Sequence, residues 1–154
     1  MATVSIQREP FDERTESARL TAGRADIGAV VAFTGICRDE DGRRSALELE
    51  HDPGMAGDEI ARIARQTEER FALKGLTVIH RHGRLTPGEP IVLVVTAASH
   101  RRAALQAAEY LMDYLKTRAP FWKKEHLSDG TTGNWVDAAE SDDRDAARWE
   151  RDSD

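Results

Sequence analysis

The sequence predicts an α+β domain in which a mainly antiparallel sheet packs against two main helices. Three observations support this class. Segments of strand and helix periodicity follow one another with short connections, an uninterrupted apolar run spans Ile91 to Ala98, and proline-glycine pairs mark turns. With 154 residues and 40% hydrophobic content, the chain is near the usual size of one domain. We therefore expect a single domain over residues 1–140 and an acidic tail over residues 141–154.

The first half of the chain predicts a short helix, two strands and a longer helix. Phe11 to Leu20 is compatible with a short amphipathic helix, and the apolar run from Gly28 to Cys37, rich in β-branched and small residues, predicts a buried strand. Alternation from Ser45 to His51 predicts a half-exposed strand. After the Pro53-Gly54 turn, apolar residues at helical spacing predict a helix that stops near Lys74-Gly75.

The second half begins with two strands. Leu76 to His82 alternates between apolar and polar residues, and Pro87-Gly88 marks a turn. The continuous apolar run from Ile91 to Ala98 predicts a central strand that is buried on both faces.

A second main helix follows this central strand. Ser99 is a candidate N-cap, and Pro120 is expected to end the helix because the residue before a proline resists helical conformation. Phe121 to Leu127 is expected to be extended. The helix carries an apolar stripe formed by Leu105, Ala108, Met112 and Leu115.

The net charge of -6 is concentrated at one end of the chain. Residues 137–154 carry eight acids and three bases, so the rest of the chain is nearly neutral and can hold a local basic site. We expect the tail to be solvated or to depend on a partner.

Composition also argues against membrane insertion and export. The longest apolar run is shorter than the roughly 20 residues that a membrane-spanning helix needs. The N-terminal segment has charged residues, among them Arg8 and Asp12, where a signal peptide would be apolar. We therefore expect a cytoplasmic protein without a membrane partner.

The start of the second main helix is a candidate anion site. Arg101, Arg102 and a protonated His100 would lie in a first turn whose dipole favours acidic residues. A bound phosphate would resolve this conflict, because free N–H groups and arginines both bind phosphate. The alternative is that both arginines point into water, at a cost of about 0.3–1 kcal/mol each.

The end of the same helix carries a second basic cluster. Lys116 and Arg118 suit a helix C-terminus, so a solvated helix end is the more conservative interpretation. Lys123 and Lys124 lie beyond the helix, and neighbouring side chains of an extended segment point oppositely, so only one of them can face a given pocket. A lysine in such a cluster can exchange protons or engage a reactive carbonyl carbon.

Other candidates are weaker. Arg38 follows the first predicted strand and is either an ordinary strand-end charge or another anion ligand. Cys37 ends an apolar strand and is more plausibly a small buried hydrophobe than a nucleophile. Because His51, His80 and His82 lack metal-ligand spacing as a set, we assign no metal and no cofactor.

Several blocks of the sequence resemble the molybdopterin synthase large-subunit family. They occur in the family's order and span roughly residues 28–150, and the last block is long and therefore specific. The blocks are Ala32 to Gly35, Leu49 to His51 with Pro53 to Met55, Val78 to Arg81, Ser99 to Arg101, and Met112 to Glu125.

The resemblance implies a hammerhead-like α/β arrangement and a sulfurtransferase activity. Members of the family convert cyclic pyranopterin monophosphate into molybdopterin with sulfur from a small ubiquitin-like carrier subunit that ends in a Gly-Gly thiocarboxylate. It also implies a homodimer at the core of a heterotetramer. This chain ends in Asp152-Ser153-Asp154, so it would receive the carrier's tail. The alternative is a noncatalytic phosphate-binding or scaffold protein with the same fold.

The resemblance assigns roles to seven residues. They are the catalytic Lys116 and Lys123, the substrate-anion ligands Arg38, His100 and Arg101, and the lining residues Phe33 and Met112. The family often has an arginine where this chain has Ala139, which leaves a contact from that position in question.

The spacing of these residues predicts a site that is shared between two copies of the chain. His100 and Lys116 are sixteen positions apart on one helix, or about 24 Å, so one small pterin cannot touch both. We therefore expect Lys116 and Lys123 of one copy to meet His100 and Arg101 of another. A nucleic-acid partner is not expected, because the chain lacks a broad basic surface.

Overall fold

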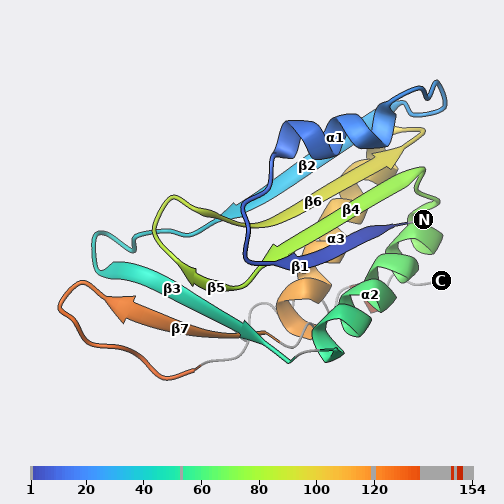
Figure 1. The fold of residues 1–154 in the computed structure, drawn as a ribbon. Helices are drawn as coiled ribbons and strands as arrows, with labels where there is room; N and C mark the ends of the chain where they lie inside the picture. Colours follow the sequence, from blue (N-terminus) through green and yellow to red (C-terminus); the bar gives the residue numbers. More distant parts are fainter. Residues whose placement is uncertain (1, 53, 119–120, 136–146, 148, 151–154) are drawn as a thin grey trace.

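The computed structural model describes residues 2–52, 54–118, 121–135, 147 and 149–150. Within these residues the protein folds around two β-sheets (Figure 1). The first sheet has four strands in the order β1 (Thr3–Gln7), β4 (Gly75–Arg81), β6 (Pro90–Ala98) and β2 (Ala29–Ile36). Strand β1 runs parallel to β4, and the other neighbours are antiparallel. The second sheet is antiparallel, in the order β5 (Gly83–Leu85), β3 (Arg44–His51) and β7 (Phe121–Leu127).

Among the elements assigned within the described ranges, three helices cover the first sheet. Helices α2 (Met55–Phe71) and α3 (Arg101–Arg118) lie on one face, and the short α1 (Glu13–Thr21) lies on the other (Figure 1). The α+β class with a mainly antiparallel sheet is therefore confirmed. The two main helices are the predicted ones.

Strand β6 forms the centre of the core. Its side chains alternate between the two faces: Val92 and Val94 pack toward α2 and α3, whereas Leu93 and Val95 pack toward the side of α1. Val94 and Val95 are both 0% exposed. The predicted burial of this strand on both faces is confirmed.

Strand β2 departs from the prediction. It lies at an edge of the first sheet, and Val30, Phe33 and Ile36 are 39%, 41% and 53% exposed. The prediction of a buried strand over Gly28 to Cys37 is therefore wrong for most of its length, although Cys37 itself is only 2% exposed. β-Branched and small residues favour a strand, but they do not determine whether that strand has neighbours on both sides.

Element boundaries also differ from expectation. Strand β1 was missed by sequence reasoning, and α3 begins at Arg101, two residues after the proposed cap Ser99. Helix α2 ends at Phe71, a few residues before the predicted end near Lys74-Gly75. The next residue, Ala72, adopts a left-handed conformation with φ 49° that terminates the helix. The predictions at Pro53 and Pro120, at Ala139, and for most of the acidic tail fall on residues outside the described ranges.

Trp149 of the predicted tail packs onto the helices. Its ring makes edge contacts with Phe71 and Tyr110, and its indole N–H donates to Asp113 at 2.6 Å. Trp149 is thus packed against α2 and α3 and is not solvated. Dependence of the tail on a partner, the other expectation, stays a prediction. Within the described ranges, no helix combines the length and apolarity that crossing a membrane requires.

Candidate active site

A pocket of about 840 Å³ lies where the first sheet passes into the second. Its walls come from the end of β2 and the loop that follows, from the last turns of α3, and from β7 and the residues after it. Arg38, Lys116 and Lys123 all line this pocket. The fold therefore brings together three of the seven predicted site residues, although Arg38 is far from the two lysines in sequence.

The extended backbone of β7 separates the two neighbouring lysines. Lys123 pairs with Leu49 of β3 and lines the pocket, whereas the Nζ atom of Lys124 lies 5.2 Å from the centre of the Trp135 ring. The prediction that these lysines do not face the same pocket is confirmed. The two side chains point in opposite directions because successive residues of a strand face opposite sides of the sheet.

Positive charge predominates in the pocket. Among its described lining residues, five side chains are cationic and three are acidic. The cations are Arg38, Arg43, Arg44, Lys116 and Lys123, and the acids are Glu40, Glu125 and Asp129. A preorganised excess of cations stabilises bound anions and negative charge that develops during a reaction.

Arg44 organises the loop that carries Arg38. Its side chain is 10% exposed, donates to the backbone oxygen of Arg38 at 3.1 Å, and pairs with Glu125 at 3.2 Å. Arg38 itself is 80% exposed and pairs with Glu40 at 3.0 Å. Sequence reasoning missed Arg44 and Glu40, because charges in a polar loop give no local sign of which ones turn inward.

Cys37 lines the pocket but is not suited to nucleophilic chemistry. Burial raises the pKa of its thiol above the ordinary value, and nearby Arg44 opposes this shift only in part. The reactive form of cysteine is the thiolate, which this environment disfavours. The interpretation of Cys37 as a small buried hydrophobe agrees with its surroundings.

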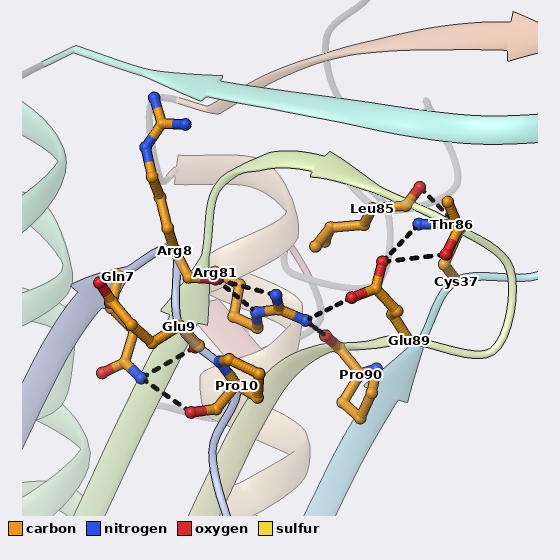
Figure 2. A network of polar contacts seen from close by, with 10 residues as sticks. All are labelled: Gln7, Arg8, Glu9, Pro10, Cys37, Arg81, Leu85, Thr86, Glu89 and Pro90. Carbon is orange, nitrogen blue, oxygen red and sulfur yellow. Dashed lines mark hydrogen bonds and ion pairs between the residues drawn. The ribbon is translucent and has the colours of Figure 1, made fainter.

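A buried arginine holds the pocket wall in place (Figure 2). Arg81 donates to the backbone oxygen of Arg8 at 2.8 and 3.0 Å and to that of Pro90 at 3.0 Å, and it pairs with Glu89 at 3.4 Å. The backbone oxygen of Glu89 accepts from the N–H of Cys37 at 2.9 Å. The residue that precedes Arg38 is thus tied to Glu89, immediately before β6.

His80 adds a neutral ring near Lys116. It stacks on Phe121 with ring centres 3.9 Å apart, and its Nδ1 lies 2.8 Å from the backbone oxygen of Arg81. Because a carbonyl oxygen only accepts, Nδ1 must carry a proton. Burial lowers the pKa of His80 to about 4, and the positive charge of Lys116 contributes to the same shift. His80 is therefore uncharged at neutral pH.

Two further histidines lie close by without forming a metal site. The rings of His51 and His82 are 4.5 Å apart, and His51 also approaches Phe121. Desolvation by burial lowers the pKa of His82. In the part of the chain that the structure describes, no group of three or more His, Cys, Asp or Glu side chains is arranged to hold a metal ion.

The other four predicted site residues lie outside the described lining of this pocket. Met112 is partly buried against the main core, and Phe33 lies on the exposed edge strand β2. His100 and Arg101 are exposed at the start of α3, whereas Lys116 is near its end (Figure 1). A single chain therefore does not unite all seven residues.

Known proteins resemble this chain along nearly its whole length. A molybdopterin synthase catalytic subunit from Mesorhizobium japonicum is 64% identical over 151 residues, which cover 98% of this chain and 95% of the relative. The solved structure of a molybdopterin biosynthesis MoaE protein from Burkholderia ambifaria has a TM-score of 0.84 and 46% identity, and the match covers 97% of this chain and 99% of that one.

A more distant structure shares the fold. It is a protein-protein complex of subunits 1 and 2 of molybdopterin-converting factor from Helicobacter pylori, with a TM-score of 0.70 and 22% identity over 89% of this chain and 90% of that one. The family model described as MoaE protein matches residues 6–118. With that match and its 64% identity to a catalytic subunit of molybdopterin synthase, the chain belongs to the MoaE protein family.

Proposed function

We propose that the chain is the catalytic subunit of a molybdopterin synthase. In this role it transfers sulfur from the thiocarboxylated Gly-Gly terminus of a small ubiquitin-like carrier subunit to cyclic pyranopterin monophosphate, and so forms the dithiolene of molybdopterin. The convergence of Arg38, Lys116 and Lys123 on one cationic pocket carries the proposal. The names of the close relatives support the same activity.

The charge of the pocket suits every species in this reaction. The thiocarboxylate, the substrate phosphate and the thiolate or enolate-like intermediates are all anions, and fixed cations stabilise such groups in proportion to the negative charge they carry. No protein thiol is needed, because sulfur arrives on the carrier. The raised pKa of the Cys37 thiol is consistent with a reaction that does not use this residue.

The cationic side chains divide into two roles. Arg38 is exposed and can present a planar guanidinium to the substrate phosphate, a geometry that favours paired hydrogen bonds. Lys116 and Lys123 hold the thiocarboxylate and pass protons as each sulfur adds. Water then releases the carboxylate of the carrier.

The complete site requires a second copy of the chain. His100 and Arg101 lie at the far end of α3 from Lys116, so we propose that a second copy supplies them and that the homodimer forms the core of a heterotetramer with two carriers. The Helicobacter pylori relative, which was solved as a complex of two subunits, supports a small-subunit partner. The expected cytoplasmic location stays a prediction from the sequence.

Reconstitution from purified components tests the activity. The chain is incubated with thiocarboxylated carrier and pyranopterin, and dithiolene product is measured by mass spectrometry. Lys123→Ala should lower kcat by at least about 100-fold, as expected for loss of a proton-transfer group. The matched control Lys124→Ala, which removes a cation from the other face of β7, should change kcat by less than about threefold. No product with the unaltered chain would favour the noncatalytic alternative.

Mixed dimers test the shared site. Lys116→Ala and Arg101→Ala chains are each expected to be inactive, whereas their equimolar mixture should recover about a quarter of full activity because half of the dimers have one intact site. Size-exclusion chromatography confirms that both variants dimerise. Dimers that form and recover nothing would contradict the shared arrangement.

A further inference from the structure

The loop after β2 places an acidic side chain between two arginines of the pocket. Oε1 of Glu40 lies 3.0 Å from an Arg38 nitrogen and 3.6 Å from an Arg44 nitrogen. The two arginines differ in environment, because the side chain of Arg38 is 80% exposed and that of Arg44 is 10% exposed. One carboxylate therefore contacts both the proposed phosphate ligand and a buried cation.

The guanidinium of Arg44 can bind a further acceptor in addition to its present partners. Its Nη2 already lies 3.2 Å from Glu125, and its Nε is a buried donor with no hydrogen-bond partner within the described structure. A buried donor without a partner is unfavourable, so an additional acceptor near this guanidinium is favoured. Arg44 thus offers Glu40 a second position close to the first.

We propose that Glu40 is an internal counter-ion of the anion pocket, which bridges Arg38 and Arg44 while the pocket is empty and shifts fully to Arg44 when a phosphate binds Arg38. This inference deepens the proposed function, because Arg38 is the substrate-phosphate ligand there. Glu40 acts as a specificity-determining residue. A ligand must displace a carboxylate, so a phosphate dianion competes better than a singly charged anion.

Hydrogen bonds tie down the backbone of the loop, so we expect the exchange to involve side chains alone. Glu40, Asp41 and Gly42 have φ angles of 53°, 59° and 82°, which form a tight left-handed turn. The turn is closed by a hydrogen bond from the N–H of Arg44 to the oxygen of Asp39 at 2.9 Å. Ser128 ties the loop to the segment after β7 through Gly42 at 2.6 Å and Arg43 at 2.7 Å.

Phosphate binding to the isolated chain tests this inference. Inorganic phosphate is titrated by calorimetry against the unaltered chain, Glu40→Gln and Asp41→Asn at constant ionic strength. Asp41→Asn is a matched control, because it removes the same charge from the next residue without changing the described lining of the pocket. Glu40→Gln should bind phosphate about two- to fivefold more tightly, as expected for release from an exposed ion pair. Asp41→Asn should change the affinity by less than about 1.5-fold, because Asp41 does not line the pocket and so does not compete with phosphate for Arg38.

A double-mutant cycle shows whether Glu40 acts through Arg38. In an Arg38→Ala chain, Glu40→Gln should no longer increase phosphate affinity, because the masked cation is absent. An equal gain in both backgrounds would show general repulsion and would overturn the proposal. Equal affinities of the unaltered chain and Glu40→Gln, including no detectable binding to either, would also overturn it. Circular dichroism checks that each variant is folded.

These measurements separate the inference from the proposed function. Phosphate binding requires neither carrier nor sulfur transfer, so tighter binding by Glu40→Gln would support the counter-ion even if reconstitution gave no product. Conversely, if the chain is an active synthase but Glu40→Gln and Asp41→Asn bind phosphate equally well, the proposed function stands and the counter-ion proposal is wrong.

Discussion

The stacked histidine near the pocket predicts that the fold loses stability in mild acid. His80 has an ordinary pKa of 6.5, which burial against Phe121 lowers to about 4 in the folded chain. Between these two values the unfolded chain binds a proton that the folded chain does not. Protonation of His80 therefore has little effect on stability above pH 6.5, and stability falls as the pH drops from 6.5 toward 4.

The size of the effect follows from the same two values. For one group with these pKa values, proton linkage gives a loss of about 2 kcal/mol in unfolding free energy between about pH 7 and about pH 5. His80→Gln should remove this contribution, because an amide does not titrate. The variant can still donate toward the backbone oxygen of Arg81, although it loses the ring stack and some stability at neutral pH.

Denaturant unfolding at the two pH values measures this difference. Urea titrations of the unaltered chain and His80→Gln, at one protein concentration, give each unfolding free energy by linear extrapolation. The unaltered chain should lose about 2 kcal/mol more than the variant on acidification. Equal losses would refute the reasoning, as would an NMR titration in which the folded His80 ring protonates above about pH 6.

Three further substitutions test the packing and the hydrogen bonding of the fold. A Cβ atom on Gly28 would lie 2.0 Å from the backbone oxygen of Ser99, so Gly28→Ala should lower the unfolding free energy by more than about 2 kcal/mol in urea titrations. A Cβ atom on Gly57 of α2 would meet no atom within 4 Å, so Gly57→Ala should raise the unfolding free energy by about 0.5–1 kcal/mol. A similar change in unfolding free energy at both glycines would contradict this account. Trp149→Phe keeps an aromatic ring but loses the donor to Asp113 and part of the packed ring surface, which should cost at least about 1.5 kcal/mol and lower Tm by at least about 3 °C in thermal scans. An unchanged Tm would mean that this hydrogen bond adds no net stability.

Local periodicity was sufficient to predict the central elements. The apolar run of β6 depends on contacts that repeat along one segment, so the sequence shows it directly. The predicted stripe of α3 is only partly right, because Ala108 and Leu115 are buried whereas Leu105 is 56% exposed. The opposite orientation of Lys123 and Lys124 follows equally from strand geometry. These features need no knowledge of distant residues.

Features that depend on distant pairing were missed or misjudged. Strand β1 pairs in parallel with β4, more than 70 residues away. Its five residues form too short a pattern to indicate a strand or its partner from the sequence. The exposure of β2 depends on its place at the sheet edge, which its composition does not encode. The roles of Arg44 and Glu40 appear only once the loop is folded against β7.

The two lysines of the pocket come from different layers of the molecule. Lys116 lies on α3, which packs on the first sheet, and Lys123 lies on the second sheet. The separation of the two amines is therefore set by the junction between the sheets, not by either sheet alone. A chimera of two relatives that are joined after Arg118 would inherit one amine from each parent, and its turnover would report how well this junction tolerates exchange of its halves.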